Sequence, residues 1–162
     1  MTKTSVLANP APAPGGLDDL PGHHIRRLQQ IAVALFLQET EPHNITPVQF
    51  AALQAVADAP GIDQRTLART IGFDTSTIGG VVDRLEARSL LARQADPQDR
   101  RVRLLTITPE GRKLLKAATP AMLRAQHRIL EPLAPKQREE FMRMLRTLVV
   151  ANNAHSRAPS EV

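Results

Sequence analysis

The sequence predicts a mainly α-helical protein that carries one small two-stranded β-hairpin. Two pairs in which threonine precedes proline, Thr46-Pro47 and Thr108-Pro109, are typical of helix starts, with threonine as the N-cap. Residues 90–94 and 102–107 instead have the composition of strands and flank a polar loop. Apolar residues on either side of this region recur every three to four positions, as they do in amphipathic helices.

The first helix is expected to begin at Pro21 or Gly22 and to end at about Thr40, ahead of Pro42. At about 100° per residue, one of its faces is apolar, and His24 falls within that face. The apolar positions are Ile25, Leu28, Ile31, Ala32, Leu35 and Phe36.

Three shorter helices are expected before the hairpin. They begin at Pro47, after Asp63 and after Asp74. Their expected ends are Pro60-Gly61, Gly72 and the neighbourhood of Ser89.

Two more helices are expected after the hairpin. The first begins at Pro109, and Pro120 either kinks it or limits it. The last follows Pro135 and carries apolar residues at helical spacing, namely Phe141, Met144, Leu145 and Leu148. The first helix and these two expose more apolar surface than the small central region covers. A homodimer through the N- and C-terminal helices is therefore expected.

Composition excludes several classes of function for this chain of 162 residues. It has no cysteine, which excludes disulfides, thiolate metal ligands and cysteine nucleophiles. With four Phe and neither Tyr nor Trp, it lacks the rings for an RNA-binding surface built on aromatic stacking. A formal net charge of +5 favours a polyanionic partner.

The sequence also predicts no catalytic site, no cofactor and no metal. It has no phosphate-binding glycine loop, nucleophile elbow or paired catalytic carboxylates, so we do not expect an enzyme. Its five histidines lack metal-ligand spacing. The apolar run from Ile31 to Leu37 is too short to span a membrane, and no signal peptide is recognisable. We expect a cytoplasmic protein with no membrane partner.

Residues 64–85 have the spacing of a helix-turn-helix. Ala68 is small enough for two helices to approach, Gly72 permits a left-handed turn, and Ile78 is placed to pack the second helix on the first. The alternative is an ordinary helix hairpin. At the start of the second helix, small polar side chains and a glycine are suited to the major groove of DNA, with an arginine further along for phosphate. These candidate DNA-binding residues are Thr75, Ser76, Thr77, Gly80 and Arg84. Simple helix capping is the alternative explanation of the hydroxyl groups.

The hairpin loop offers a second candidate contact to DNA. Arg100 and Arg101 at its tip suit a narrow, electronegative minor groove. Asp99 is placed to hold the Arg101 guanidinium in an extended pose. A solvated charged turn is the alternative.

These segments together resemble the MarR family of winged-helix bacterial transcriptional regulators. The resemblance lies in residues 82–86 (VDRLE), 90–93 (LLAR), 96–101 (DPQDRR) and 105–111 (LTITPEG). It implies that Arg101 enters the minor groove and that the helix over residues 74–89 reads the major groove of a palindromic operator. Ser89 departs from the family pattern, which commonly has glycine there. The lack of cysteine excludes the peroxide-sensing branch.

With this resemblance the chain divides into five parts. They are a disordered Ala/Pro-rich tail at 1–18, an N-terminal dimerisation helix at 19–45, a winged helix-turn-helix lobe at 46–108, C-terminal dimerisation helices at 109–154 and a mobile tail at 155–162.

The resemblance also implies a small aromatic or heteroaromatic acid as effector, bound between the dimer helices and the DNA-binding lobe. Cationic side chains beside apolar ones suit such a carboxylate. The candidate residues are His23, His24, Arg27, Phe50 and Leu53. His24 bonding across the dimer is the alternative. The expected function is a ligand-responsive repressor. The alternatives are an effector-independent architectural DNA-binding protein and a metal-responsive repressor.

Overall fold

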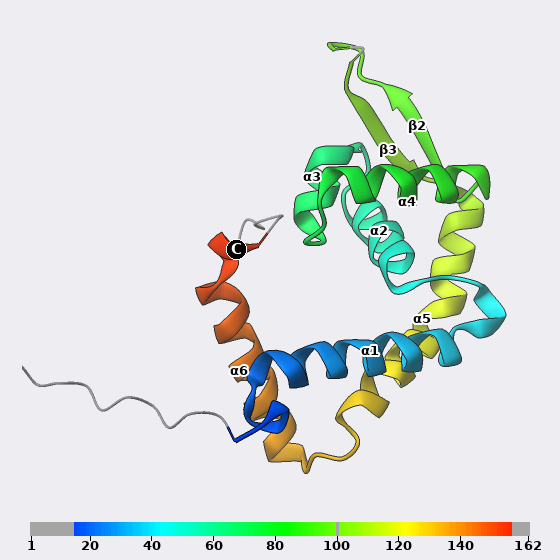
Figure 1. Cartoon of the computed structure of the whole chain (residues 1–162). Coiled ribbons are helices and arrows are strands. Elements are labelled where there is room, and N and C mark those ends of the chain that lie inside the picture. The colour runs from blue at the N-terminus through cyan, green and yellow to red at the C-terminus, as the bar shows by residue number, and fades with distance from the viewer. Residues whose placement is uncertain (1–14, 100, 157–162) are drawn as a thin grey trace, which may run out of the picture.

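The computed structural model of the chain describes residues 15–99 and 101–156, which form a helical molecule with one small sheet (Figure 1). The helices are α1 (Pro21–Glu39), α2 (Pro47–Asp58), α3 (Gln64–Thr70), α4 (Thr75–Ala87), α5 (Pro109–Leu130) and α6 (Pro135–Ala151). The strands are β1 (Ile62–Asp63), β2 (Leu91–Ala95) and β3 (Arg103–Ile107). Short 3-10 turns lie at Leu17–Asp19, Glu41–His43 and Asn153–His155. The predicted mainly α-helical fold class is confirmed.

The helix starts follow from side-chain caps that the sequence encodes. Thr46 Oγ1 accepts the N–H of Gln49, whose side chain accepts the N–H of Thr46 in return. Thr108 Oγ1 accepts the N–H of Gly111 at 3.0 Å and so starts α5 in the same way. Helix α5 continues through Pro120, which is exposed and does not end it. Of the two predicted effects of Pro120, ending the helix is therefore wrong, because α5 runs on to Leu130.

The sheet has three strands where the sequence predicts two. It is antiparallel in the order β1-β3-β2, with Ile62 opposite Leu105 and Leu91 opposite Ile107. Strand β1 is only two residues long, too short for the alternation of apolar and polar residues that reveals a strand. The predicted hairpin is β2 and β3, and β1 adds an edge that ties the start of α3 to it.

The predicted tails coincide only in part with the described residues. Leu17–Asp19 form a 3-10 turn inside the stretch predicted as an N-terminal tail, and the Gly15 N–H donates to Asp19 Oδ2 at 2.7 Å. Residues 1–14 and 157–162, which make up most of both tails, lie outside the described residues. None of the helices in the described ranges is both long and apolar enough to cross a membrane.

The central lobe has the densest core. Helices α2, α3 and α4 and the sheet bury large aliphatic side chains completely, among them Leu53, Val56, Leu67, Ile78, Leu85 and Leu105. Gly111 fits tightly where α5 meets this lobe, because a Cβ there would lie 2.1 Å from the Leu90 carbonyl oxygen. The lobe therefore holds α4 and the hairpin in a fixed relation.

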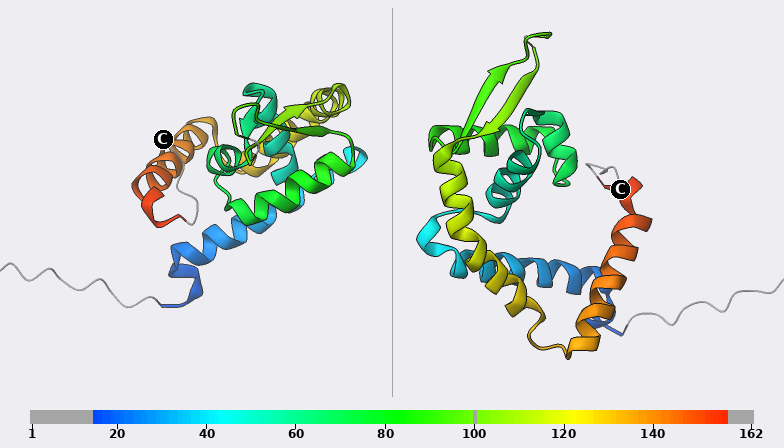
Figure 2. Two further views of the ribbon diagram at one scale, coloured as in Figure 1. Left: turned by 90° about the horizontal axis from the view of Figure 1, so that it is seen from above. Right: turned by 180° about the vertical axis from the view of Figure 1, so that it is seen from behind.

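Helices α1, α5 and α6 form the other part of the molecule. Helix α1 packs along α5, and Glu39 joins them by ion pairs to Arg124 at 2.9 Å and Arg128 at 3.0 Å. These two guanidinium groups lower the pKa of Glu39. Helix α6 has no buried residue and is separated from the α2–α4 lobe in Figure 1 and in the right view of Figure 2. One apolar helix face is thus left uncovered within the chain.

Candidate nucleic-acid interface

Helices α3 and α4 pack as a helix-turn-helix. Ala68 and Ile78 are both buried in the shared core, as the spacing predicts. Gly72 in the turn has a φ of +70°, and the following Phe73 N–H donates to the Ala68 carbonyl at 2.9 Å. The turn thus places the first residues of α4 at the surface, where Thr75, Ser76 and Thr77 are all exposed.

Asp74 organises the beginning of α4. Its carboxylate accepts hydrogen bonds from the Ser76 hydroxyl, from the Thr77 N–H at 2.8 Å and from the Thr77 hydroxyl at 2.7 Å. The side-chain bonds from Ser76 and Thr77 are the main cause of the strongly lowered pKa of Asp74. Because both hydroxyl hydrogens are donated to the carboxylate, the two oxygens remain available as hydrogen-bond acceptors.

The glycines of α4 allow close approaches. A Cβ on Gly79 would lie 3.4 Å from Gln64 Nε2, so the start of α3 lies against α4 at this point. A Cβ on Gly80 would lie 3.6 Å from an Arg84 guanidinium nitrogen, so Arg84 folds back along the helix over Gly80. Gly80 and Arg84, both predicted as DNA contacts, therefore share one side of α4.

The loop of the hairpin is shaped by its aspartates. Asp96 Oδ1 accepts the Gln98 N–H at 2.8 Å, and Asp99 Oδ1 accepts the Arg101 N–H at 3.0 Å. The predicted pairing of Asp99 with the Arg101 guanidinium is wrong. The backbone N–H of Arg101 is the nearest donor to the Asp99 carboxylate, and the hydrogen bond between them closes a local turn. Arg101 remains exposed, and Arg100 lies outside the described residues.

Arg93 fastens the hairpin to α4, a role the sequence did not reveal. Its guanidinium bonds to Asp83 at 2.6 Å and to Glu86 at 2.9 Å. Three-residue spacing puts these two carboxylates on one face of α4, which is the signal that predicts such a bridge. At the end of α4, Arg88 donates to the carbonyl oxygen of Asn44 at 2.6 Å. Helix α4 is thus tied to the hairpin and to the connection that follows α1.

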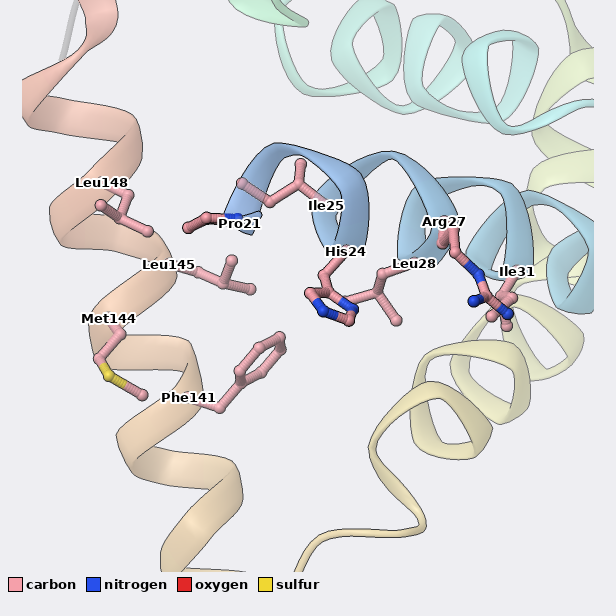
Figure 3. A pocket seen from close by; sticks show the side chains of 10 residues that line it. All are labelled: Pro21, His24, Ile25, Arg27, Leu28, Ile31, Phe141, Met144, Leu145 and Leu148. Carbon is pink, nitrogen blue, oxygen red and sulfur yellow. The ribbon is translucent and has the colours of Figure 1, made fainter. Parts of the chain in front are cut away.

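A separate apolar cavity of about 670 Å³ lies between α1 and α6 (Figure 3). Its lining residues are Pro21, His24, Ile25, Arg27, Leu28 and Ile31 from α1 and Phe141, Met144, Leu145 and Leu148 from α6. His24 and Phe141 reach toward the same space from the two helices. His24 Nε2 donates to the Asp18 carbonyl at 2.7 Å, and the His23 ring lies edge-on to His24 at 5.6 Å.

The structure does not bring every predicted effector residue to this cavity. His24 and Arg27 line it, whereas Leu53 is completely buried in the lobe core. Phe50 is also buried and packs edge-on against Phe36, with the ring centroids 6.0 Å apart. The expected wall of Phe50 and Leu53 beside His24 is therefore absent within one chain. Helical phase indicates which way His24 faces, but it does not identify the helix opposite, and here that helix is α6.

No group of three or more His, Asp or Glu side chains is arranged to hold a metal within residues 15–99 and 101–156.

The helix-turn-helix carries exposed hydroxyl groups and an arginine on α4, and the β-hairpin joined to it carries further arginines. This arrangement defines a winged-helix DNA-binding protein.

Comparison with known proteins identifies the family. The sequence pattern of the MarR family matches residues 43–102. The chain is 33% identical over 129 residues to the transcriptional regulator HosA of Escherichia coli O111:H-, covering 80% of this chain and 94% of HosA. The chain belongs to the MarR family, and it is a transcriptional regulator rather than an enzyme.

Two solved structures are similar over most of the chain. One is the transcriptional repressor CouR bound to a 23-mer DNA duplex, with 32% identity, a TM-score of 0.78, and coverage of 83% of this chain and 96% of CouR. The other is BpsR of Bordetella bronchiseptica, whose DNA binding is regulated by 6-hydroxynicotinic acid. It has 33% identity, a TM-score of 0.79, and coverage of 84% of this chain and 97% of BpsR.

Proposed function

We propose that the chain is a homodimeric repressor that binds a palindromic operator and leaves it when a small aromatic or heteroaromatic carboxylate binds. The observation that carries the proposal is the start of α4, where Asp74 holds two exposed hydroxyl groups in place beside a hairpin fixed by Arg93. Positioned hydroxyls on a helix read base edges, and the arginine of a neighbouring hairpin enters the minor groove.

The distribution of exposed apolar side chains supports the dimer. Apart from Leu17, the large apolar side chains that are more than two-fifths exposed all lie on α1, α5 and α6. They are Ile25, Ile31, Leu37, Leu123, Met144, Leu148, Val149 and Val150. The lobe, by contrast, exposes only Phe73 among its large hydrophobics, at 37%. Apolar surface gathered in this way is typical of an interface between chains. A second copy of the chain covers most of this surface and gives the two recognition helices that a palindrome requires.

The α1–α6 cavity supports the effector. Arg27 supplies a cation for a carboxylate, and the apolar cavity side chains that the second chain leaves uncovered supply walls for a ring. The similarity to BpsR favours a heteroaromatic acid such as 6-hydroxynicotinic acid. Release follows if the ligand binds better to a dimer whose recognition helices are wrongly spaced for the operator.

DNA binding is tested by selecting duplexes from a random pool and measuring their affinity by fluorescence anisotropy. Half-sites about ten base pairs apart are expected. Thr77→Val or Ser76→Ala should change base preference by about 1–3 kcal/mol per lost contact. Arg101→Ala should weaken binding to all sequences. A uniform loss in all three variants contradicts the assignment of α4 as the reading helix.

Release is tested by adding 6-hydroxynicotinic acid and related aromatic acids to the complex. Arg27→Ala should weaken the effective acid by about tenfold or more, because it removes a charged hydrogen bond. Arg26→Ala is the matched control, since Arg26 does not line the cavity and its guanidinium donates to Gln30 Oε1 at 3.5 Å. His24→Ala with unchanged operator affinity and unchanged release removes His24 from the site. Equal losses in the two arginine variants contradict the cavity as the effector site.

A further inference from the structure

A second hollow, lined by arginines, lies between α3 and the hairpin. It has a volume of about 580 Å³ and is lined by Asp63, Gln64, Arg65, Thr66, Arg69, Arg101, Val102 and Arg103. Four guanidinium groups thus gather around one hollow with a single carboxylate. We call it the arginine groove.

The one carboxylate in the arginine groove is already engaged. Asp63 accepts the backbone N–H groups of Arg65 at 2.9 Å and of Thr66 at 3.0 Å, and the Thr66 hydroxyl at 2.6 Å. It caps α3 and therefore has little capacity left to neutralise the surrounding arginines.

Three arginines of the groove carry no neutralising partner in the part of the chain that the structure describes. The guanidinium groups of Arg65, Arg101 and Arg103 are exposed, and among the described residues none has an ion-pair or hydrogen-bond partner. Away from the groove, many guanidinium groups are paired with carboxylates or carbonyl oxygens, for instance those of Arg88, Arg93, Arg124, Arg128, Arg138 and Arg143. The groove therefore presents unneutralised positive charge that no group of the fold requires.

The position of the groove identifies the anion. Gln64 lies in the groove and also against α4 at Gly79, while Arg101 lies in the groove and on the hairpin. If α4 enters a major groove and the hairpin enters the adjacent minor groove, one phosphodiester strand must pass between them. The arginine groove lies beside this path, between the hairpin and α3, whose Gln64 lies against α4.

We propose that the arginine groove holds the sugar-phosphate backbone that separates the major groove read by α4 from the minor groove entered by the hairpin, with Arg65 and Arg103 binding phosphates. This inference rests on the proposed DNA-binding function. Guanidinium groups bind phosphate oxygens in a bidentate manner and carry no base information from there. The DNA strand is then bound by α3 on one side and by β3 on the other. These contacts fix the register of the lobe on the duplex.

The test is the salt dependence of operator affinity in the double variant R65A/R103A. Each phosphate contact contributes about 0.9 to the slope of log affinity against log salt, and each of the two chains loses two contacts, so the slope should fall by about 3.6. Between 50 and 200 mM salt the wild type should then lose about 150-fold more affinity than the double variant. The loss should be the same on operator and on random duplex. R65K/R103K should restore most of the slope.

Arg146→Ala is the control for the loss of positive charge. Arg146 is exposed on α6, and helical phase places it opposite the apolar face of that helix. A double variant that keeps the wild-type slope, while Arg101→Ala loses affinity, overturns the arginine groove but leaves the proposed function intact. An equal fall in slope for Arg146→Ala shows a general charge effect and also overturns the groove. Failure of the wild type to bind any duplex rejects the proposed function itself.

Discussion

Ser89 offers a direct test of how the chain passes from α4 into the hairpin. It has a φ of +58°, in the left-handed region that side chains with a Cβ avoid. The Ser89 N–H donates to the Glu86 carbonyl at 2.8 Å, and its own carbonyl accepts the Thr108 hydroxyl at 2.7 Å. Both hydrogen bonds involve backbone groups of residue 89, so the Ser89→Gly variant keeps both bonds. The Ser89 hydroxyl has no partner among the described residues.

The expected size of the effect follows from two opposing terms. A residue with a Cβ in the left-handed region costs about 1–2 kcal/mol. Glycine loses about 0.4–1 kcal/mol more conformational entropy on folding. Ser89→Gly should therefore raise the free energy of unfolding by about 0.5–1 kcal/mol, and the Tm by about 1–4 °C for a chain of this size.

Gly72→Ala is the mirror-image control. Gly72 has a φ of +70°, and a Cβ there would have no atom within 4 Å, so steric overlap adds nothing to the cost. It should destabilise by about 0.5–1 kcal/mol, the same size with the opposite sign. Urea unfolding at one fixed protein concentration measures both variants and their combination, since a dimer's stability depends on concentration. A loss of stability in Ser89→Gly refutes the reasoning.

Three further predictions concern the cap of α4, a close contact and the dimer. Because the pKa of Asp74 is lowered by folding, its stabilising effect is complete above its unfolded pKa of about 4 and is lost as the pH falls further. The Tm difference between wild type and Asp74→Asn should therefore shrink below about pH 4; a constant difference contradicts this. Gly111→Ala should destabilise by about 2–3 kcal/mol because its Cβ meets the Leu90 carbonyl, whereas Gly22→Ala, in open space on α1, should be neutral or stabilising in thermal unfolding. Leu145→Asp should give a monomer in sedimentation at micromolar concentration, and Arg146→Ala a dimer; a wild-type monomer rejects the dimer.

Helix starts were predictable because their signals are local. A threonine or aspartate before a proline or polar turn satisfies the first backbone N–H groups whatever the rest of the chain does. The start of α4 was predictable for the same reason, including Asp74 as its cap. Gly72 marked its turn because only glycine adopts that backbone without cost.

The features that the sequence did not reveal depend on segments far apart in the chain. Strand β1 exists only because β3 offers it an edge. The cavity beside His24 is closed by α6, more than a hundred residues further along, so the periodicity of α1 gives no information about it. The three-residue spacing of Asp83 and Glu86 is visible in the sequence, but the partner, Arg93, is identified only once the hairpin folds back on α4.

The most direct test of the account is the affinity of the wild-type protein for a selected palindrome and for a shuffled duplex of equal length and composition, measured at physiological salt. The account predicts that two chains bind one palindrome and that the palindrome binds at least about a thousandfold more tightly than the shuffled duplex. Equal affinity for the two duplexes contradicts sequence-specific reading by α4 and leaves an architectural DNA-binding protein as the function.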